Sequence, residues 1–246
     1  MQPIYNVDGN FINLMNSGGR PISPIWATNQ LIAHKGGNAG TANTIANFEA
    51  GIANGYKILE GDVRFTSDTV PVLSHDASVS GYTIASYTYD QIHALVPTLA
   101  RLDDFLFLCK QNNVCAELDF TKEYNASQIQ KCYDTIKSCG MLGRTMVTAY
   151  AAQVRAFIEI DADMILCASG ISTTSAVDAL ADVIAAARLV VCSVESANVT
   201  KSLIDYMHTK GCLCKPWTVN SVSTVNTLFG NGADYIITDS VLPSAL

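Results

Sequence analysis

The sequence predicts an α/β protein of the (β/α)8 or TIM-type barrel class, folded as a single domain. Eight short apolar runs with strand character alternate with longer segments whose apolar residues recur at helical spacing. The length of 246 residues suits one such barrel. An open doubly wound sheet is the alternative, and it is weakened because no Gly-x-Gly-x-x-Gly motif follows an early strand.

An N-terminal extension or cap with little regular structure is expected at 1–30, a stretch rich in Asn, Gly, Ser and Pro. The barrel is expected to fill 31–246. Its eight strands are predicted at 31–34, 57–63, 114–119, 145–148, 163–167, 188–194, 212–218 and 234–238. An additional short strand at 70–74 is expected to pair back through the turn at 67–69.

Helices are expected in the intervals between these strands. Thr44 or Asn43 can cap the first helix, which carries apolar residues at helical spacing and ends near Gly55. Ser221 can cap the last. The apolar positions that mark the helices are Ile45, Phe48 and Ile52; Leu102, Phe105, Leu106 and Cys109; Ile129, Cys132 and Ile136; Val154 and Phe157; Val177, Leu180 and Ile184; Leu203, Ile204 and Met207; and Val222, Val225 and Phe229.

The composition excludes several classes of protein. Hydrophobic residues make up 49% of the chain and charged residues 15%, which is enough for a substantial core and is not typical of disorder. A net charge of −7 argues against a broad basic surface for nucleic acid. The chain contains no run of about 18 apolar residues, so no membrane span is predicted. The first residues lack the pattern of a signal peptide, so a cytoplasmic location is expected.

The eight cysteines all lie in the second part of the chain and mostly in apolar segments. We expect them to be reduced and to fill small positions of the core. The pair Cys212-x-Cys214 has no second pair at zinc-ribbon spacing, which favours packing over metal binding.

Two histidines flank a pair of acids that shares one strand face. His34 ends the apolar run 31–33, Glu60 and Asp62 alternate with apolar residues, and His75 follows the short strand at 70–74. Because side chains alternate along a strand, Glu60 and Asp62 point the same way. Adjacent acids repel each other unless a cation or a shared proton intervenes, and histidines exchange protons near neutral pH. The pattern predicts a metal-assisted acid–base site.

Glu117 and Asp119 form a second pair of acids on one strand face. In a barrel of this class the functional residues lie where the strands end, and Glu60, Asp62 and Glu117 all lie near such ends. Four converging carboxylates require a divalent cation. Oxygen ligands without clustered cysteines favour one Mg²⁺ or Ca²⁺ ion over a softer metal.

An ordered set of motifs from about Leu31 to Asp239 resembles the glycerophosphodiester phosphodiesterase family. The matching segments are Ile32-Ala33-His34-Lys35-Gly36-Gly37, Asn43-Thr44, Phe48, Glu60-Gly61-Asp62-Val63-Arg64-Phe65-Thr66, Val72-Leu73-Ser74-His75-Asp76, Pro97-Thr98-Leu99, Ala116-Glu117-Leu118, Trp217-Thr218-Val219-Asn220 and Gly232-Ala233-Asp234-Tyr235-Ile236-Ile237-Thr238-Asp239. Each segment is unspecific alone, whereas their order and spacing together are specific.

The resemblance implies a barrel that binds one divalent cation through Glu60, Asp62 and Glu117. It also implies that His34 and His75 are the general acid and the general base, without assigning which is which. The implied reaction cleaves a phosphodiester of glycerol and releases an alcohol and a glycerol phosphate. The substrate partner is therefore expected to be a small phosphodiester.

Three positions are candidates for contact with the substrate. Lys35 stands where the family usually has arginine, and it can hold phosphate as a point charge. Asp119 stands where the family often has lysine; either it joins the metal shell, or a cation such as Lys122 compensates for it, or phosphate binding is weakened. Trp217 can stack on the glycerol or alcohol group, or it can pack at the rim.

Two alternatives to this activity remain open. One is a phospholipase of the same barrel type that acts on intact lipid, against which the net acidity and the lack of an exposed apolar helix argue. The other is a barrel with weakened catalysis that acts as a binding module, an alternative motivated by Lys35 and Asp119.

Overall fold

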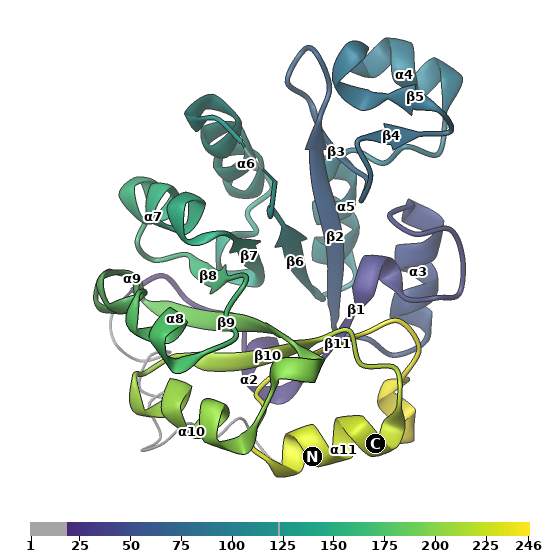
Figure 1. Ribbon diagram of the computed structural model, residues 1–246. Helices are drawn as coiled ribbons and strands as arrows, with labels where there is room; N and C mark the ends of the chain where they lie inside the picture. The colour runs from purple at the N-terminus through teal and green to yellow at the C-terminus, as the bar shows by residue number, and fades with distance from the viewer. Residues whose placement is uncertain (1–18, 123) are drawn as a thin grey trace.

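The protein is described by a computed structural model over residues 19–122 and 124–246, in which eight parallel strands form a nearly closed barrel with helices between them (Figure 1). The strands are β1 (Leu31–Ala33), β2 (Ile58–Phe65), β6 (Cys115–Asp119), β7 (Thr145–Ala149), β8 (Ile165–Ala168), β9 (Leu189–Glu195), β10 (Leu213–Trp217) and β11 (Ile236–Thr238). Their ladders run in the order β10-β9-β8-β7-β6-β2-β1-β11. The amides of Asp234 and Tyr235 donate to the Cys214 carbonyl and link β11 to β10. The predicted fold class is confirmed.

The helices alternate with the strands. They are α2 (Ile25–Thr28), α3 (Ile45–Ala53), α4 (Tyr89–Leu95), α5 (Leu102–Gln111), α6 (Ala126–Ser138), α7 (Ala151–Ile160), α8 (Thr174–Asp178), α9 (Ala181–Ala186), α10 (Lys201–Thr209) and α11 (Val222–Gly230), with short 3-10 turns η2 (His34–Gly36), η3 (Ile84–Ser86), η4 (Leu142–Arg144), η5 (Ser196–Asn198) and η6 (Pro243–Ala245). The single helix expected around Val177 and Ile184 is two short helices, because Leu180 leaves helical geometry between them (φ −97°, ψ 9°).

The caps that the sequence suggested begin their helices. The Thr44 hydroxyl accepts a hydrogen bond from the Asn47 amide at the start of α3, and Ser221 does the same for Thr224 at the start of α11. Each cap satisfies an amide that has no partner within its own helix. The helices therefore begin where a polar side chain can replace the missing carbonyl.

The core has two layers separated by the barrel wall. One apolar cluster lies inside the barrel and includes Ile32, Ile58, Cys115, Met146, Ile165, Leu189, Leu213 and Tyr235 together with Trp26 of α2. A larger cluster fills the space between the strands and the surrounding helices. The eight cysteines are unpaired, and seven of them are buried. Apolar side chains on both faces of the strands are typical of a parallel sheet.

A small lobe extends from the barrel beyond the end of β2 (Figure 1). Strand β3 (Pro71–Leu73) pairs antiparallel with β2, as the sequence predicted. The hairpin of β4 (Ser78–Val79) and β5 (Tyr82–Thr83), followed by α4, was not predicted, because two-residue strands are too short to show a periodicity. A separate apolar cluster of Val72, Ile84, Ile92, Val96 and Leu99 holds this lobe together.

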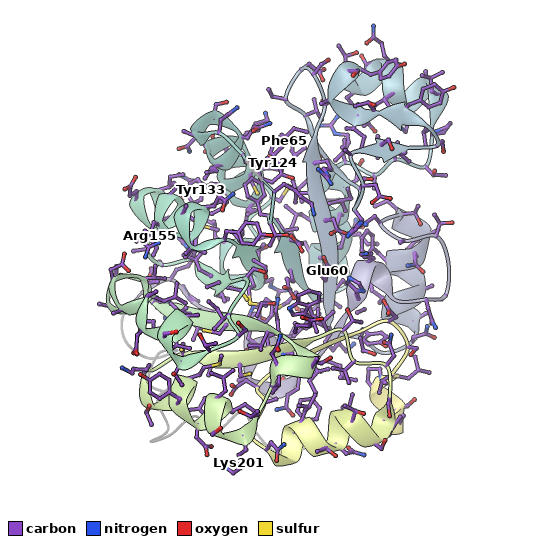
Figure 2. The ribbon with its side chains drawn as sticks, viewed as in Figure 1. Glu60, Phe65, Tyr124, Tyr133, Arg155 and Lys201 are labelled. Atoms are coloured by element: carbon purple, nitrogen blue, oxygen red, sulfur yellow. The ribbon has the colours of Figure 1, made fainter. Side chains whose placement is uncertain are left out.

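Strand β2 is longer than its neighbours, and its far end is supported by aromatic packing. Phe65 contacts Tyr124 with ring centroids 5.3 Å apart, on the side of β2 that faces α6 (Figure 2). The Tyr124 hydroxyl also donates to the Val63 carbonyl. These contacts hold the end of β2 in place above the barrel.

The expected extension at 1–30 is described only in its second part. Residues 1–18 lie outside the described residues, so the expectation for them stays a prediction. In residues 19–30 the chain forms α2, whose Trp26 is buried against Tyr235 with ring centroids 5.9 Å apart. Across 19–122 and 124–246, every helix is too short or too polar to cross a membrane.

Candidate active site

A cavity of about 340 Å³ opens at the C-terminal ends of the barrel strands. Its lining residues are His34, Lys35, Glu60, Asp62, His75, Glu117, Asp119, Thr121, Lys122, Thr148, Tyr150, Ser169, Gly170, Ser193, Lys215, Trp217, Thr218 and Ile237. All eight residues that the sequence and the resemblance singled out are among them. The fold therefore brings together groups that lie up to 183 positions apart, from His34 to Trp217.

The register between β2 and β6 places the acids opposite one another. Glu60 pairs with Glu117 and Asp62 pairs with Asp119 across this parallel ladder. Gly61, between the two acids of β2, faces the helical layer, where an added Cβ would lie 3.3 Å from Phe48. Glycine there lets α3 pack closely on β2 while its neighbours face the cavity.

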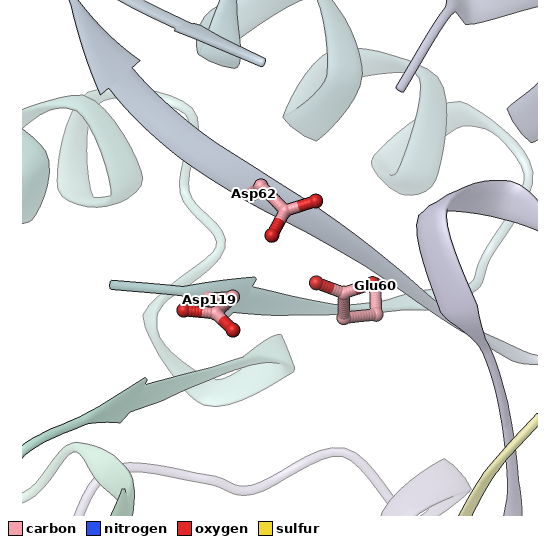
Figure 3. A group of neighbouring side chains, drawn as sticks. All are labelled: Glu60, Asp62 and Asp119. Carbon is pink, nitrogen blue, oxygen red and sulfur yellow. The ribbon is translucent and has the colours of Figure 1, made fainter. Parts of the chain in front are cut away.

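Three of the four acids form a compact cluster. Glu60, Asp62 and Asp119 each offer a carboxylate oxygen, and these oxygens all lie within 4.8 Å of one another (Figure 3). Two of them come from β2 and one from β6 (Figure 3). The resemblance implied Glu117 as the third ligand, whereas the third member of this cluster is Asp119. Glu117 lies on the same strand, two residues before Asp119.

Each acid of the cluster is held on one oxygen by neutral donors. The Lys35 amide donates to Glu60 Oε2 at 2.7 Å, and Asn43 Nδ2 donates to Asp62 Oδ2 at 2.8 Å. The Thr121 amide and hydroxyl donate to Asp119 Oδ1 at 2.7 and 2.5 Å. Among the described residues, the second oxygen of each acid makes no hydrogen bond. These oxygens are positioned and available to a ligand.

The electrostatics of the cluster fit a divalent cation. Burial, followed by the charges of Asp62, Asp119 and Glu117, raises the pKa of Glu60 well above its usual range, against a lowering by the Lys35 amide. In the described part of the chain, no lysine or arginine side chain forms an ion pair with these three acids. Carboxylates crowded in this way favour an oxygen-binding cation such as Mg²⁺ or Ca²⁺.

Glu117 has a different environment, because it forms an ion pair with the buried Lys215. Lys215 Nζ also lies 3.0 Å from the Thr148 hydroxyl, which donates to Glu117 Oε1 at 2.6 Å. Burial alone would lower the pKa of Lys215, but Cys167 and Glu117, with a further contribution from Asp119, outweigh it and raise the pKa. The other oxygen, Glu117 Oε2, is buried without a partner among the described residues.

Lys215 was missed at the sequence level. The signal was available, since Lys215 interrupts an apolar predicted strand two residues before Trp217 and so shares its face. A lysine buried inside a barrel requires an acid as its partner, and the acids of β6 were the candidates.

His34 lies at the start of η2 and is oriented from the far end of the chain. Its Nδ1 lies 2.7 Å from Asp239 Oδ1, and Asn220 Nδ2 donates to the other oxygen of Asp239 at 2.7 Å. Burial would raise the pKa of Asp239, but the hydrogen bonds from Asn220 and His34 lower it. Asp239 therefore carries a negative charge that orients the ring through Nδ1, and Nε2 is not engaged by this contact. The sequence had assigned no role to Asp239.

His75 also lines the cavity and lies just after β3. Its Nδ1 lies 2.9 Å from Asp76 Oδ1, and Arg64 donates to its backbone carbonyl at 2.6 Å. The His75 side chain is 53% exposed, against 23% for His34. The two histidines thus line one cavity and come from different segments of the chain, each with a carboxylate on Nδ1.

The mouth of the cavity combines aromatic and basic side chains. Trp217 is 39% exposed at the end of β10, and Tyr150 is 49% exposed just after β7. Lys35 and Lys122 also line the cavity. The rim can therefore contact both an apolar or hydroxylated group and an anion.

Comparison with known proteins agrees with this arrangement. The model of the Glycerophosphoryl diester phosphodiesterase family matches residues 34–242. Glycerophosphodiester phosphodiesterase 1 of Rattus norvegicus is 39% identical over 72 residues, which make up 27% of this chain and 22% of that protein. The match thus spans about a fifth of the length of this curated relative.

Solved structures share the fold at low sequence identity. A glycerophosphodiester phosphodiesterase from Parabacteroides distasonis has a TM-score of 0.72 and 21% identity, over 86% of this chain and 92% of that chain. A phosphodiesterase from Oleispira antarctica, solved with the product sn-glycerol-3-phosphate, has a TM-score of 0.72 and 15% identity, over 85% and 92%. Because the family model covers most of the sequence, this chain belongs to the Glycerophosphoryl diester phosphodiesterase family, a family of hydrolases.

Proposed function

We propose that this protein hydrolyses glycerophosphodiesters to a glycerol phosphate and an alcohol, with one divalent cation and two histidines. The observation that carries the proposal is the meeting of His34, His75 and a cluster of carboxylates in one cavity at the barrel mouth. Family membership supports the reaction class. The glycerol phosphate bound to the structurally similar Oleispira antarctica protein supports the product.

The cation would be Mg²⁺ or Ca²⁺, held by Glu60, Asp62 and an acid of β6, either Glu117 or Asp119. Bound there, it would offset the negative charge that develops on the phosphate oxygens in the transition state. Buried carboxylates with free oxygens support this role. Glu60 would otherwise carry its charge among other acids without compensation.

His34 and His75 would move the two protons of the reaction. One accepts a proton from the attacking hydroxyl or water, and the other donates a proton to the departing alkoxide. Asp239 and Asp76 hold the Nδ1 atoms, so that Nε2 of each ring would serve the substrate. The presence of both histidines in the lining of one cavity supports this division of labour.

The substrate would be held by the rim. Lys35 and Lys122 can attract the phosphate as point charges, and Trp217 can stack on the glycerol or on the leaving alcohol. Asp119, on the same rim, would repel the phosphate unless a cation lies between them.

The proposal is tested by assaying the purified full chain on a panel of glycerophosphodiesters with different alcohols. Glycerol phosphate release is measured with Mg²⁺, with Ca²⁺ and after chelation, and an intact phospholipid serves as a further substrate. We expect metal-dependent release from a glycerophosphodiester and little turnover of the intact lipid. Absence of metal-dependent turnover on the whole panel would contradict the proposal, and preference for the lipid would favour a phospholipase.

A further inference from the structure

The four acids of the cavity are not equivalent, because among the described residues only Glu117 forms a direct ion pair with a lysine. Lys215 comes from β10 and reaches Glu117 on β6, and both side chains are almost completely buried, at 0% and 1% exposed. Thr148 of β7 joins the same group through Glu117 Oε1. Side chains from two other strands, β7 and β10, thus hold Oε1 of the Glu117 carboxylate.

Among the described residues, the other three acids form no ion pair with a lysine or arginine, although the charge of Lys215 also acts on Asp119 at longer range. Glu60, Asp62 and Asp119 are held by an amide, an asparagine and a threonine, all of which are neutral. Each keeps one oxygen without a hydrogen bond among the described residues. Their oxygens, and not those of Glu117, make up the compact set within 4.8 Å.

We propose that Asp119, not Glu117, is the third ligand of the cation, and that Lys215 is a positioning residue that holds Glu117 away from it. This inference rests on the proposed function, whose cation site it specifies. It replaces the ligand set that the resemblance implied, and it explains why Asp119 occupies a position where a lysine is expected. In place of a lysine at position 119 of β6, Lys215 of β10 supplies a positive charge and pairs with Glu117.

The physical reason is competition for the same carboxylate. A cation on either oxygen of Glu117 would lie close to the ammonium of Lys215, and two positive charges at short range repel strongly inside a protein. Moving Glu117 instead would leave Lys215 buried without a partner, which is costly. Asp119 loses no ion pair when it binds the cation.

Glu117 Oε2 supplies a second, independent sign that a ligand belongs here. It is a buried acceptor on the cavity wall without a hydrogen-bond partner among the described residues. Buried acceptors are normally satisfied, so a donor group of the ligand is expected to reach this oxygen. Glu117 would then contact what is bound without being a ligand of the cation.

The first test measures binding of Mg²⁺ and Ca²⁺ alone to the full chain by calorimetry, with the metal-dependent shift in melting temperature as a second readout. We expect Asp119→Asn to raise the Kd at least about tenfold, and Glu117→Gln to raise it by clearly less than Asp119→Asn does. The opposite result, in which Glu117→Gln loses the ion and Asp119→Asn keeps it, overturns the inference.

A rescue experiment tests the positioning role of Lys215. Replacing Lys215 with methionine releases Glu117, which can then take the place of a missing Asp119. We therefore expect Asp119→Asn/Lys215→Met to bind the metal more tightly than Asp119→Asn alone. Because loss of a nearby positive charge can tighten metal binding by itself, Glu117→Gln/Asp119→Asn/Lys215→Met is the control and should show no rescue. An equal gain in this control, or an unchanged or higher Kd in Asp119→Asn/Lys215→Met, would overturn the positioning role.

The double variant Glu117→Gln/Lys215→Met keeps the test decisive if single lysine variants fold poorly. It removes both charges of the pair, so it avoids a buried charge without a partner. We expect its metal Kd to stay within about threefold of the wild type. A tenfold weakening would show that the pair, and not Asp119, carries the site.

Failure of this inference is distinguishable from failure of the proposed function. If the wild type binds the metal and hydrolyses the diester, but depends on Glu117, only the ligand assignment is wrong. If it binds the metal through Asp119 and hydrolyses no diester, only the proposed activity is wrong. If the wild type binds neither ion, both are wrong.

Discussion

The two ends of the barrel carry opposite kinds of side chain, although the same strands supply both. On β2, Ile58 belongs to the apolar cluster inside the barrel, whereas Glu60 and Asp62, further along the same face, line the cavity. On β10, Leu213 lies in the apolar cluster and Lys215 lines the cavity. A step of two residues along a strand therefore changes the environment from apolar to charged.

The difference separates stability from chemistry. The end of the barrel that holds the apolar cluster, here called the lower end, removes apolar surface from water, which is the main favourable term in folding. The end with the cavity, here called the upper end, concentrates acids. Burial first, and then the neighbouring acids, raise the pKa of Glu60, so negative charge is unfavourable there without a bound cation. We infer that the lower end stabilises an upper end that is arranged for binding.

The largest expected effect lies at the upper end, at the two histidines. His34→Ala and His75→Ala should each lower kcat/KM by about 10²- to 10⁴-fold, because we propose that each residue transfers a proton in the reaction. The melting temperature should change little, since both side chains are partly exposed. Steady-state kinetics and thermal unfolding measure the two quantities.

The matched control for these variants is His93→Ala. His93 lies on α4, stacks on Tyr89 and is not among the residues that line the cavity. Its replacement should leave kcat/KM close to the wild-type value. A loss of kcat/KM as large as that of His34→Ala would show that a residue outside the cavity matters as much for activity as one that lines it.

The second effect lies at the lower end and should change stability alone. Trp26 is fully buried in the apolar cluster against Tyr235. We expect Trp26→Ala to lower the free energy of unfolding by about 3–5 kcal/mol, as for large aromatic side chains in a core. Activity per folded molecule should be retained. A fall in kcat in fully folded protein would contradict the view that this end of the barrel affects stability alone.

The third effect concerns pH and a buried pair outside the cavity. His208 Nε2 lies 2.8 Å from Asp234 Oδ2, and this hydrogen bond raises the pKa of His208 against burial, with Asp205 adding to the rise and Lys201 opposing it. Since the folded pKa exceeds the unfolded value of about 6.5, the stabilisation is complete below that pH and is lost as pH rises through the folded pKa.

Urea unfolding between about pH 6 and pH 9 measures this dependence. Hydrogen bonds to charged groups contribute about 1.5–3 kcal/mol, so the wild type should lose stability within that range as the pH rises. His208→Gln should show a flatter profile, and His93→Gln should keep the wild-type slope. Burial raises the pKa of Asp234, although the hydrogen bond from His208 lowers it. Protonation of Asp234 changes the stability at lower pH, and the series therefore begins near pH 6.

The smallest effect is expected at the rim. Trp217 is 39% exposed, so Trp217→Ala should change the free energy of unfolding far less than Trp26→Ala. Loss of an aromatic contact of about 0.5–1.5 kcal/mol should raise KM a few-fold with kcat little changed. An unchanged KM for every glycerophosphodiester would exclude Trp217 from substrate contact.

Much of the fold followed from local patterns. The eight predicted strands and the short strand at 70–74 lie within a few residues of those observed, because apolar runs between capped helices are read from neighbouring residues. The hairpin of β4 and β5 and the division between α8 and α9 were missed. Both depend on packing of short segments, which have too few residues to show a period.

The sequence by itself determined the barrel, the shared face of Glu60 and Asp62, and the set of residues that meet at the strand ends, because alternation along a strand is a local property. Only the tertiary structure decided which partner each charge takes. Lys215 reaches Glu117 across 98 positions and Asp239 reaches His34 across 205. Barrel closure brings such groups into contact, and electrostatic interaction inside a protein depends on that distance and on burial, neither of which is encoded in sequence spacing.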